Sequence, residues 1–217
     1  MVPEGLRSWL EGGRIGVKVC GITKEEDAWA AIEAGVDALG FNFYPKSKRA
    51  VSLDEVGGWI ETLPPLIGRV AVMVQPEEAL LTALQESRLF HALQFHGGES
   101  PAFCQRWADF YVKARALSHK DSADSALADP APCLLLDAHA PGLFGGTGKV
   151  IDWSLATAVR TLAQRPVVLS GGLTPENVLA GVRQVSPVAV DTASGVESSP
   201  GIKDPVKMRA FVAAARG

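Results

Sequence analysis

Short apolar runs alternate with amphipathic segments along almost the whole chain. The runs are rich in β-branched residues and recur about every twenty to thirty residues, which is typical of buried strands separated by helices. They are Ile15–Cys20, Ala38–Phe43, Arg69–Val74, Ala92–His96, Tyr111–Leu117, Cys133–Asp137, Val167–Ser170 and Val188–Thr192. The pattern therefore predicts eight strand–helix units in series.

Helices are indicated in two ways, by spacing and by start signals. Val56, Trp59, Ile60 and Leu63 fall at helical spacing, as do Met208, Phe211, Val212 and Ala215. Capping boxes are predicted at Thr23–Glu26 and Ser52–Glu55, and a cap residue followed by proline is found at Ser100–Pro101, Thr174–Pro175 and Asp204–Pro205. The segment Ser118–Pro130 is either a short helix or a loop.

Eight such units without a composition break favour a closed (β/α)8 barrel, the TIM-barrel architecture, over an open doubly wound sheet. We expect one domain over residues 1–217, in which residues 1–14 form a peripheral N-terminal extension. No Gly-x-Gly-x-x-Gly follows the first strand, so a dinucleotide cofactor has little support.

Composition narrows the range of partners. The 217 residues are 47% hydrophobic and 21% charged, with a net charge of -3, so the chain has no basic field for nucleic acid. Its apolar runs are too short to span a bilayer, and its start does not resemble a secretory signal. We expect a cytoplasmic protein with no membrane or nucleic-acid partner. The three cysteines lack the spacing of a zinc site, so we expect them to be reduced, with no metal bound.

Cys20 and Asp137 are the candidate acid–base groups, since each ends a predicted strand where barrel enzymes hold their chemistry. Cys20 also fits a small core hydrophobe, the more common fate of a lone cysteine in an apolar run. Asp137 alternatively caps the loop that follows it. That loop, residues 138–149, is long and glycine-rich, which suits either a mobile lid or a flexible surface loop.

Other strand ends carry candidate binding groups. Arg49 lies in a basic turn that suits an anionic substrate, although a solvated basic loop is an equal alternative. Gln94 and His96 share one face of the fourth strand, and Asp191 ends the eighth; all three are expected to contact substrate. His96 also fits a base or a hydrogen-bonded structural histidine.

Glycine-rich loops follow the last two predicted strands. Gly171 and Gly172 follow the seventh, while Ser194 and Gly195 follow the eighth. These are the positions at which barrels frequently bind phosphate through backbone amides. The expected ligand is therefore a phosphorylated small molecule, and the expected barrel is of the phosphate-binding type.

These motifs together resemble the phosphoribosylanthranilate isomerase family over almost all of residues 17–216. The motifs are Lys18-Val-Cys20-Gly-Ile-Thr23, Gly40-Phe-Asn-Phe-Tyr-Pro45 with Ser47-Lys-Arg49, Leu93-Gln-Phe-His96-Gly, Leu134-Leu-Leu-Asp137, Gly145-Gly-Thr-Gly148-Lys149, Ser170-Gly-Gly-Leu-Thr-Pro-Glu-Asn177 and Val190-Asp-Thr-Ala-Ser-Gly-Val-Glu197.

The resemblance implies a cofactor-free Amadori rearrangement in tryptophan biosynthesis by a monomer or homodimer. It implies that Cys20 is the general base, that Asp137 is the general acid and that Arg49 binds the anthranilate carboxylate. The acid must carry a proton near neutral pH, and the base must be a thiolate, favoured by nearby cations or a helix start. Two alternatives stay open: a related phosphosugar barrel enzyme, and a non-catalytic barrel that binds a phosphorylated ligand.

Overall fold

The computed structural model describes residues 1–11, 13–138 and 151–217, and its centre is a closed barrel of eight parallel strands. Strand β1 pairs with both β2 and β8, which closes the barrel. The barrel strands are β1 Gly16–Cys20, β2 Ala38–Asn42, β3 Gly68–Met73, β4 Ala92–Phe95, β5 Tyr111–Leu117, β6 Cys133–Ala138, β7 Val167–Leu169 and β8 Ala189–Thr192. All eight predicted strands are confirmed, as is the (β/α)8 architecture.

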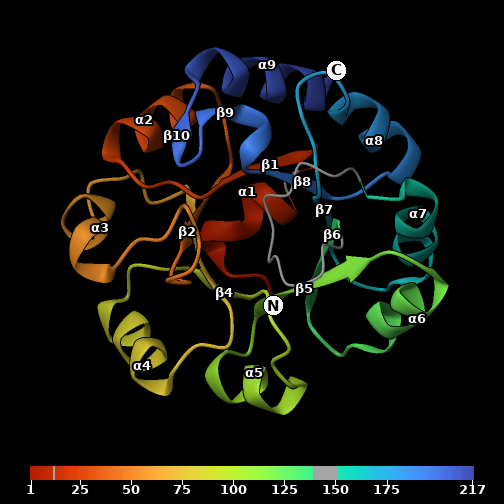
Figure 1. The fold of residues 1–217 in the computed structure, drawn as a ribbon, viewed down its shortest axis with the longest axis horizontal. Coiled ribbons are helices and arrows are strands. Elements are labelled where there is room, and N and C mark those ends of the chain that lie inside the picture. Colours follow the sequence, from red (N-terminus) through yellow and green to blue (C-terminus); the bar gives the residue numbers. More distant parts are fainter. Residues whose placement is uncertain (12, 139–150) are drawn as a thin grey trace.

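Helices surround the barrel, and Figure 1 shows them as an outer ring seen along the barrel axis. They are α2 Glu25–Glu33, α3 Leu53–Ile60, α4 Glu78–Ser87, α5 Pro101–Trp107, α6 Lys120–Ala128, α7 Trp153–Leu162, α8 Val178–Val185 and α9 Pro205–Arg216. Helix α6 shows that the segment Ser118–Pro130, for which the sequence left a helix or a loop open, forms a helix. Short elements complete the fold: η1 Glu4–Leu6, α1 Arg7–Leu10, η2 Ser194–Val196, β9 Glu197–Ser199 and β10 Ile202–Lys203.

Three predicted helix starts are confirmed and two are wrong. Ser52 forms the full capping box, and Ser100 and Asp204 cap helices whose first residue is proline. Thr23 does not cap α2, which begins after Lys24, because its hydroxyl donates instead to the carbonyl of Gly201 at 2.8 Å. Thr174 starts a turn rather than a helix, and α8 begins only after Asn177.

The apolar core has two layers because strand residues alternate between the two faces of the barrel wall. The outer layer lies between the wall and the helices and includes Val17, Val19 and Phe41. The inner layer fills the barrel itself and includes Val70 and Val112. Apolar side chains thus fill part of the barrel interior, and the cavity lined by polar groups lies at its carboxyl-terminal end.

The N-terminal extension closes the other end of the barrel. Leu6 and Trp9 are fully buried and belong to the inner-layer cluster. Gly5 and Gly16 permit this close packing, since a Cβ on either would overlap the His91 ring or the Trp9 carbonyl. The described part of this extension therefore lies outside the barrel wall yet contributes to its core.

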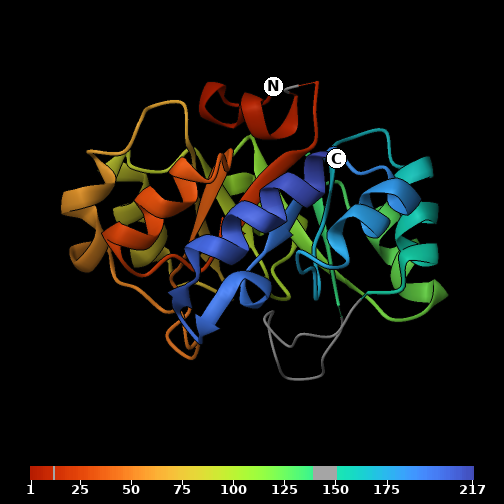
Figure 2. The same cartoon turned by 90° about the horizontal axis from the view of Figure 1, so that it is seen from above.

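The two ends of the barrel carry different short elements. Figure 2 shows the N-terminal helical turns at one end and the β9–β10 hairpin at the opposite end. The hairpin follows β8 after the short helix η2, so it lies at the carboxyl-terminal end, where the polar cavity opens. In the described parts of the chain, no helix is long and apolar enough to cross a membrane.

Candidate active site

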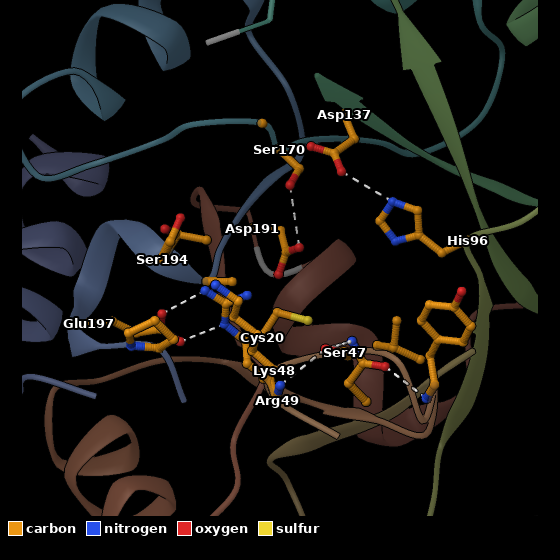
Figure 3. Close-up of a pocket in the computed structure, with 18 of the residues that line it drawn as sticks. Cys20, Ser47, Lys48, Arg49, His96, Asp137, Ser170, Asp191, Ser194 and Glu197 are labelled. Atoms are coloured by element: carbon orange, nitrogen blue, oxygen red, sulfur yellow. Dashed lines mark hydrogen bonds and ion pairs between the residues drawn. The ribbon is translucent and has the colours of Figure 1, made fainter. Parts of the chain in front are cut away.

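A cavity of about 620 Å³ opens at the carboxyl ends of the strands. Inward-facing residues from most of the barrel strands line it, together with the loops that follow. Nine of the ten candidate residues from the sequence line the cavity, and Gly195 does not. The nine are Cys20, Arg49, Gln94, His96, Asp137, Gly171, Gly172, Asp191 and Ser194. Figure 3 shows the labelled side chains gathered around this one cavity. The structure therefore brings the predicted groups together.

Cys20 lies at the cavity wall with cations nearby. It pairs in register with Gly40, and a Cβ on Gly40 would lie only 2.8 Å from the Cys20 sulfur. Burial raises the pKa of the Cys20 thiol above its usual value, although the ammonium groups of Lys18 and Lys203 pull it down. The expected cations are therefore present, but burial outweighs them and favours the neutral thiol in the ligand-free cavity.

Asp137 is the penultimate residue of β6 and lines the cavity. Its Oδ2 lies 3.1 Å from Nε2 of His96, and its Oδ1 accepts a hydrogen bond from the amide of Ala138 at 2.8 Å. Both carboxylate oxygens thus have a fixed partner. His96 lines the cavity, as a substrate-binding residue would, and of the two alternatives, a base and a hydrogen-bonded histidine, its contact with Asp137 fits the second.

Arg49 does not present a free guanidinium. Its Nε and Nη2 each donate to Glu197 at 2.6 Å, which makes a bidentate pair. Glu197 also accepts from Lys203 at 2.9 Å, and Lys203 donates to the carbonyl of Cys20 at 2.6 Å. Burial alone would raise the pKa of Glu197, but Arg49 and Lys203 outweigh it and hold that pKa below its usual value. A chain of contacts therefore links Arg49 to the backbone of Cys20.

Gln94 and Asp191 face the cavity from strands β4 and β8. Gln94 is almost fully buried, and among the described residues its Oε1 has no hydrogen-bond partner. An unpaired buried carbonyl is costly, so this oxygen is suited to a ligand hydroxyl. Asp191 accepts from Lys18 at 2.8 Å and lies 3.5 Å from the Ser170 hydroxyl.

The two glycine-rich loops lie against each other. Thr192 donates to the carbonyl of Leu173 at 2.8 Å, which joins the end of β8 to the loop after β7. A Cβ on Gly195 would overlap that same carbonyl, so only glycine allows this approach. Gly171 and Gly172 adopt positive φ angles of 83° and 68°. The loops thus expose backbone at one end of the cavity.

Three residues of the site carried no prediction from sequence: Lys18, Glu197 and Lys203. No local pattern marks their place in the site, since the Lys18–Asp191, Arg49–Glu197 and Lys203–Cys20 contacts each join residues more than 140 positions apart. The glycine-rich loop expected over the site, residues 138–149, lies outside the described residues apart from Ala138. Among described residues no His, Cys, Asp or Glu cluster suits a metal ion, and all three cysteines are free.

The fold and the cavity are typical of (β/α)8-barrel enzymes, since thiol, carboxyl and imidazole side chains gather at the carboxyl ends of the strands. The model of the N-(5'phosphoribosyl)anthranilate (PRA) isomerase family matches residues 17–214. The chain belongs to this family.

Its relatives cover almost its full length. It is 44% identical over 202 residues to N-(5'-phosphoribosyl)anthranilate isomerase of Pseudomonas fluorescens (strain Pf0-1), covering 92% of this chain and 97% of the relative. The crystal structure of the Thermotoga maritima isomerase superposes with a TM-score of 0.86 at 39% identity, covering 94% and 99%. A structure of the isomerase with reduced 1-(o-carboxyphenylamino)-1-deoxyribulose 5-phosphate gives a TM-score of 0.84 at 38% identity, covering 94% and 99%.

Proposed function

We propose that this chain catalyses the Amadori rearrangement of N-(5-phosphoribosyl)anthranilate to 1-(2-carboxyphenylamino)-1-deoxyribulose 5-phosphate, a step of tryptophan biosynthesis. The observation that carries the proposal is that Cys20 and Asp137, from strands β1 and β6, line one cavity with the glycine-rich loops at its edge. Family membership removes most of the support for a related phosphosugar enzyme. The non-catalytic alternative is left to experiment.

The reaction needs one acid and one base. Asp137 protonates the ring oxygen, the bond from that oxygen to C1′ breaks, and the aniline nitrogen supplies its lone pair to form a protonated imine. Cys20 as thiolate then removes the C2′ proton, and the electron pair of that bond neutralises the imine to give an enolamine. Loss of the C2′ hydroxyl proton and protonation at C1′ give the ketone. C1′ is reduced and C2′ is oxidised, so no external redox partner is needed.

His96 supports the acid by fixing Oδ2 of Asp137 at 3.1 Å. With its other oxygen bound to an amide, the carboxyl group is held in one orientation, which favours proton transfer along one direction. Gln94 and Asp191 are proposed to bind the sugar hydroxyls. The buried Oε1 of Gln94, which lacks a partner among the described residues, supports this role.

The two charged ends of the substrate are proposed to bind at different parts of the cavity. Backbone amides around Gly171, Gly172, Ser194 and Gly195 would bind the phosphate, since glycine permits close approach of an anion. Arg49 would bind the anthranilate carboxylate. Because Glu197 already occupies its Nε and one hydrogen of Nη2, the donors left for substrate are those of Nη1 and the second hydrogen of Nη2.

The protein is proposed to act in the cytoplasm as a monomer or homodimer. The isomerase of Thermotoga maritima is described as dimeric in a structure of monomers generated from it. Light scattering of the purified protein distinguishes the two states, and a mass of one chain or of two is the expected result.

The function is tested by following loss of substrate fluorescence with purified protein. The wild type should turn over, and Cys20→Ser and Asp137→Asn should each lose about 10²- to 10⁴-fold in kcat while remaining folded. The matched control is Cys104→Ala, a buried cysteine that does not line the cavity, and it should keep its activity. Turnover that survives within about tenfold in both site variants would remove the acid–base assignment.

A further inference from the structure

Lys18 is a buried charge to which the proposed reaction assigns no role. Its side chain is fully buried, and its ammonium lies 2.8 Å from Oδ1 of Asp191. The two residues are register partners on β1 and β8, so the pair spans the seam where the barrel closes. A buried ammonium costs free energy even when it is paired, and an apolar residue would fill a barrel interior at less cost.

The ammonium of Lys18 also lies close to the Cys20 sulfur. Lys18 and Cys20 are two positions apart on β1, so both point into the barrel. A Cβ on Gly40 would lie 2.8 Å from the sulfur and 2.9 Å from the ammonium nitrogen. The two atoms are therefore separated by no more than the sum of these distances, and glycine at position 40 leaves the space between them open.

We propose that Lys18, held in place by Asp191, is a positioning residue that stabilises the thiolate of Cys20 and so sets the pH range in which this base works. The inference rests on the proposed function, because it assumes that Cys20 is the base. A positive charge beneath the sulfur offsets the loss of hydration that the thiolate suffers in the cavity. The same charge remains after Cys20 has accepted the C2′ proton, so it favours renewed loss of that proton from the thiol.

The charged groups around Cys20 fix the sign of this effect. Lys18 from β1 and Lys203 from β10 favour the thiolate, and Asp191 from β8 opposes it. Arg49, from the loop after β2, also interacts with Cys20 but is neutralised by Glu197 of β9. Lys203 is likewise paired with Glu197. Of the two ammonium groups that lower the pKa of Cys20, that of Lys18 makes the larger contribution.

The test measures the thiolate directly, by the rate of alkylation with iodoacetamide as a function of pH. Cys104 and Cys133 are buried, and burial raises the pKa of each thiol, to about 11 and about 12, so they contribute little signal. Cys20→Ser gives the background. Lys18→Gln should move the alkylation midpoint to higher pH by about one to three units, the usual effect of losing an opposite charge at close range. The pH profile of kcat/KM should move with it, and Lys18→Arg should restore both.

The Asp191→Asn variant should shift the alkylation midpoint in the opposite direction. It removes the negative charge that opposes the thiolate, so its alkylation midpoint should fall to lower pH. A purely structural Lys18–Asp191 pair would give no such opposite shifts. If Lys18→Gln fails to fold, Lys18→Met, an uncharged side chain of similar length, takes its place, and an unshifted midpoint in the folded variant overturns the inference.

The experiment distinguishes a failure of the role proposed for Lys18 from a failure of the proposed function. If the wild type does not isomerise the substrate, the proposed function fails whatever the alkylation midpoints are. If the wild type isomerises but Lys18→Gln keeps the wild-type midpoint, the function stands and only the role of Lys18 is lost.

Discussion

Replacement of Arg49 by alanine tests how the substrate carboxylate is bound. A guanidinium has five N–H donors, and Glu197 takes two of them, at 2.6 Å each. The three remaining donors, two on Nη1 and one on Nη2, are left for the substrate carboxylate, and a charge-assisted hydrogen bond is worth about 1.5–3 kcal/mol. Arg49→Ala should therefore raise KM by about ten- to a hundredfold. The assay is steady-state kinetics by fluorescence.

Two controls separate binding from stability. Arg216→Ala removes another arginine paired with a buried carboxylate, that of Asp37, at the opposite end of the barrel, and should leave KM unchanged. A substrate analogue lacking the carboxylate should bind poorly to the wild type, and Arg49→Ala should weaken its binding little further.

Glu197 provides a coupling test of the same interaction. If Glu197 acts on substrate binding through Arg49, Glu197→Gln should change KM in the wild type but not in the Arg49→Ala background. An Arg49→Ala variant that loses as much with the analogue as with the substrate would refute the reasoning.

Three further predictions concern the barrel floor, acid stability and the phosphate loops. Trp9→Ala should cost about 3–5 kcal/mol, because a fully buried indole is lost from the inner core, and should lower Tm by roughly 6–20 °C in calorimetry; the half-exposed Trp29→Ala should change Tm far less. Burial lowers the pKa of His91 to about 4 from its usual 6.5, so the unfolded chain takes up a proton that the folded chain does not as pH falls between those values. The free energy of unfolding in urea should therefore decrease from pH 6.5 towards pH 4, and His91→Gln should reduce that slope; an unchanged slope would exclude His91 as its cause. Gly195→Ala, whose Cβ overlaps a carbonyl of the neighbouring loop, should weaken inhibition by inorganic phosphate by about tenfold or more, whereas Gly58→Ala, with open space around it, should not.

The barrel itself was readable from sequence because its determinants are local. Parallel strands buried on both faces appear as short apolar runs, and the spacing between them leaves room for one helix each. Ser52 and Ser100 begin helices through contacts only three residues away. Side chains at strand ends, such as Cys20 and Asp137, follow from the fold, because all parallel strands end at the same edge.

Non-local contacts account for what sequence did not reveal. Thr23 has the spacing of a capping residue, yet it donates to Gly201, far along the chain. The partner of Arg49 is Glu197, and the hairpin that carries Lys203 brings it beneath the Cys20 carbonyl. No local pattern encodes such pairs, because they depend on closure of the barrel.

Burial of the N-terminal extension also depends on non-local contacts. Leu6 and Trp9 gain their core environment only when the barrel floor exists to receive them. Their spacing does not show whether the segment is buried or exposed. The sequence therefore predicted a peripheral extension but not its packing against the barrel.

The most direct test of the account is the single-turnover rate with substrate carrying hydrogen or deuterium at C2′, with enzyme in excess and product separated by chromatography. Under these conditions product release does not mask the chemical step. The wild type should form the deoxyribulose product and be slowed severalfold by deuterium, and Cys20→Ser should lose about 10²- to 10⁴-fold in this rate. Product formed by Cys20→Ser at the wild-type rate, or no isomerisation by the wild type at all, would contradict the claim that Cys20 removes the C2′ proton.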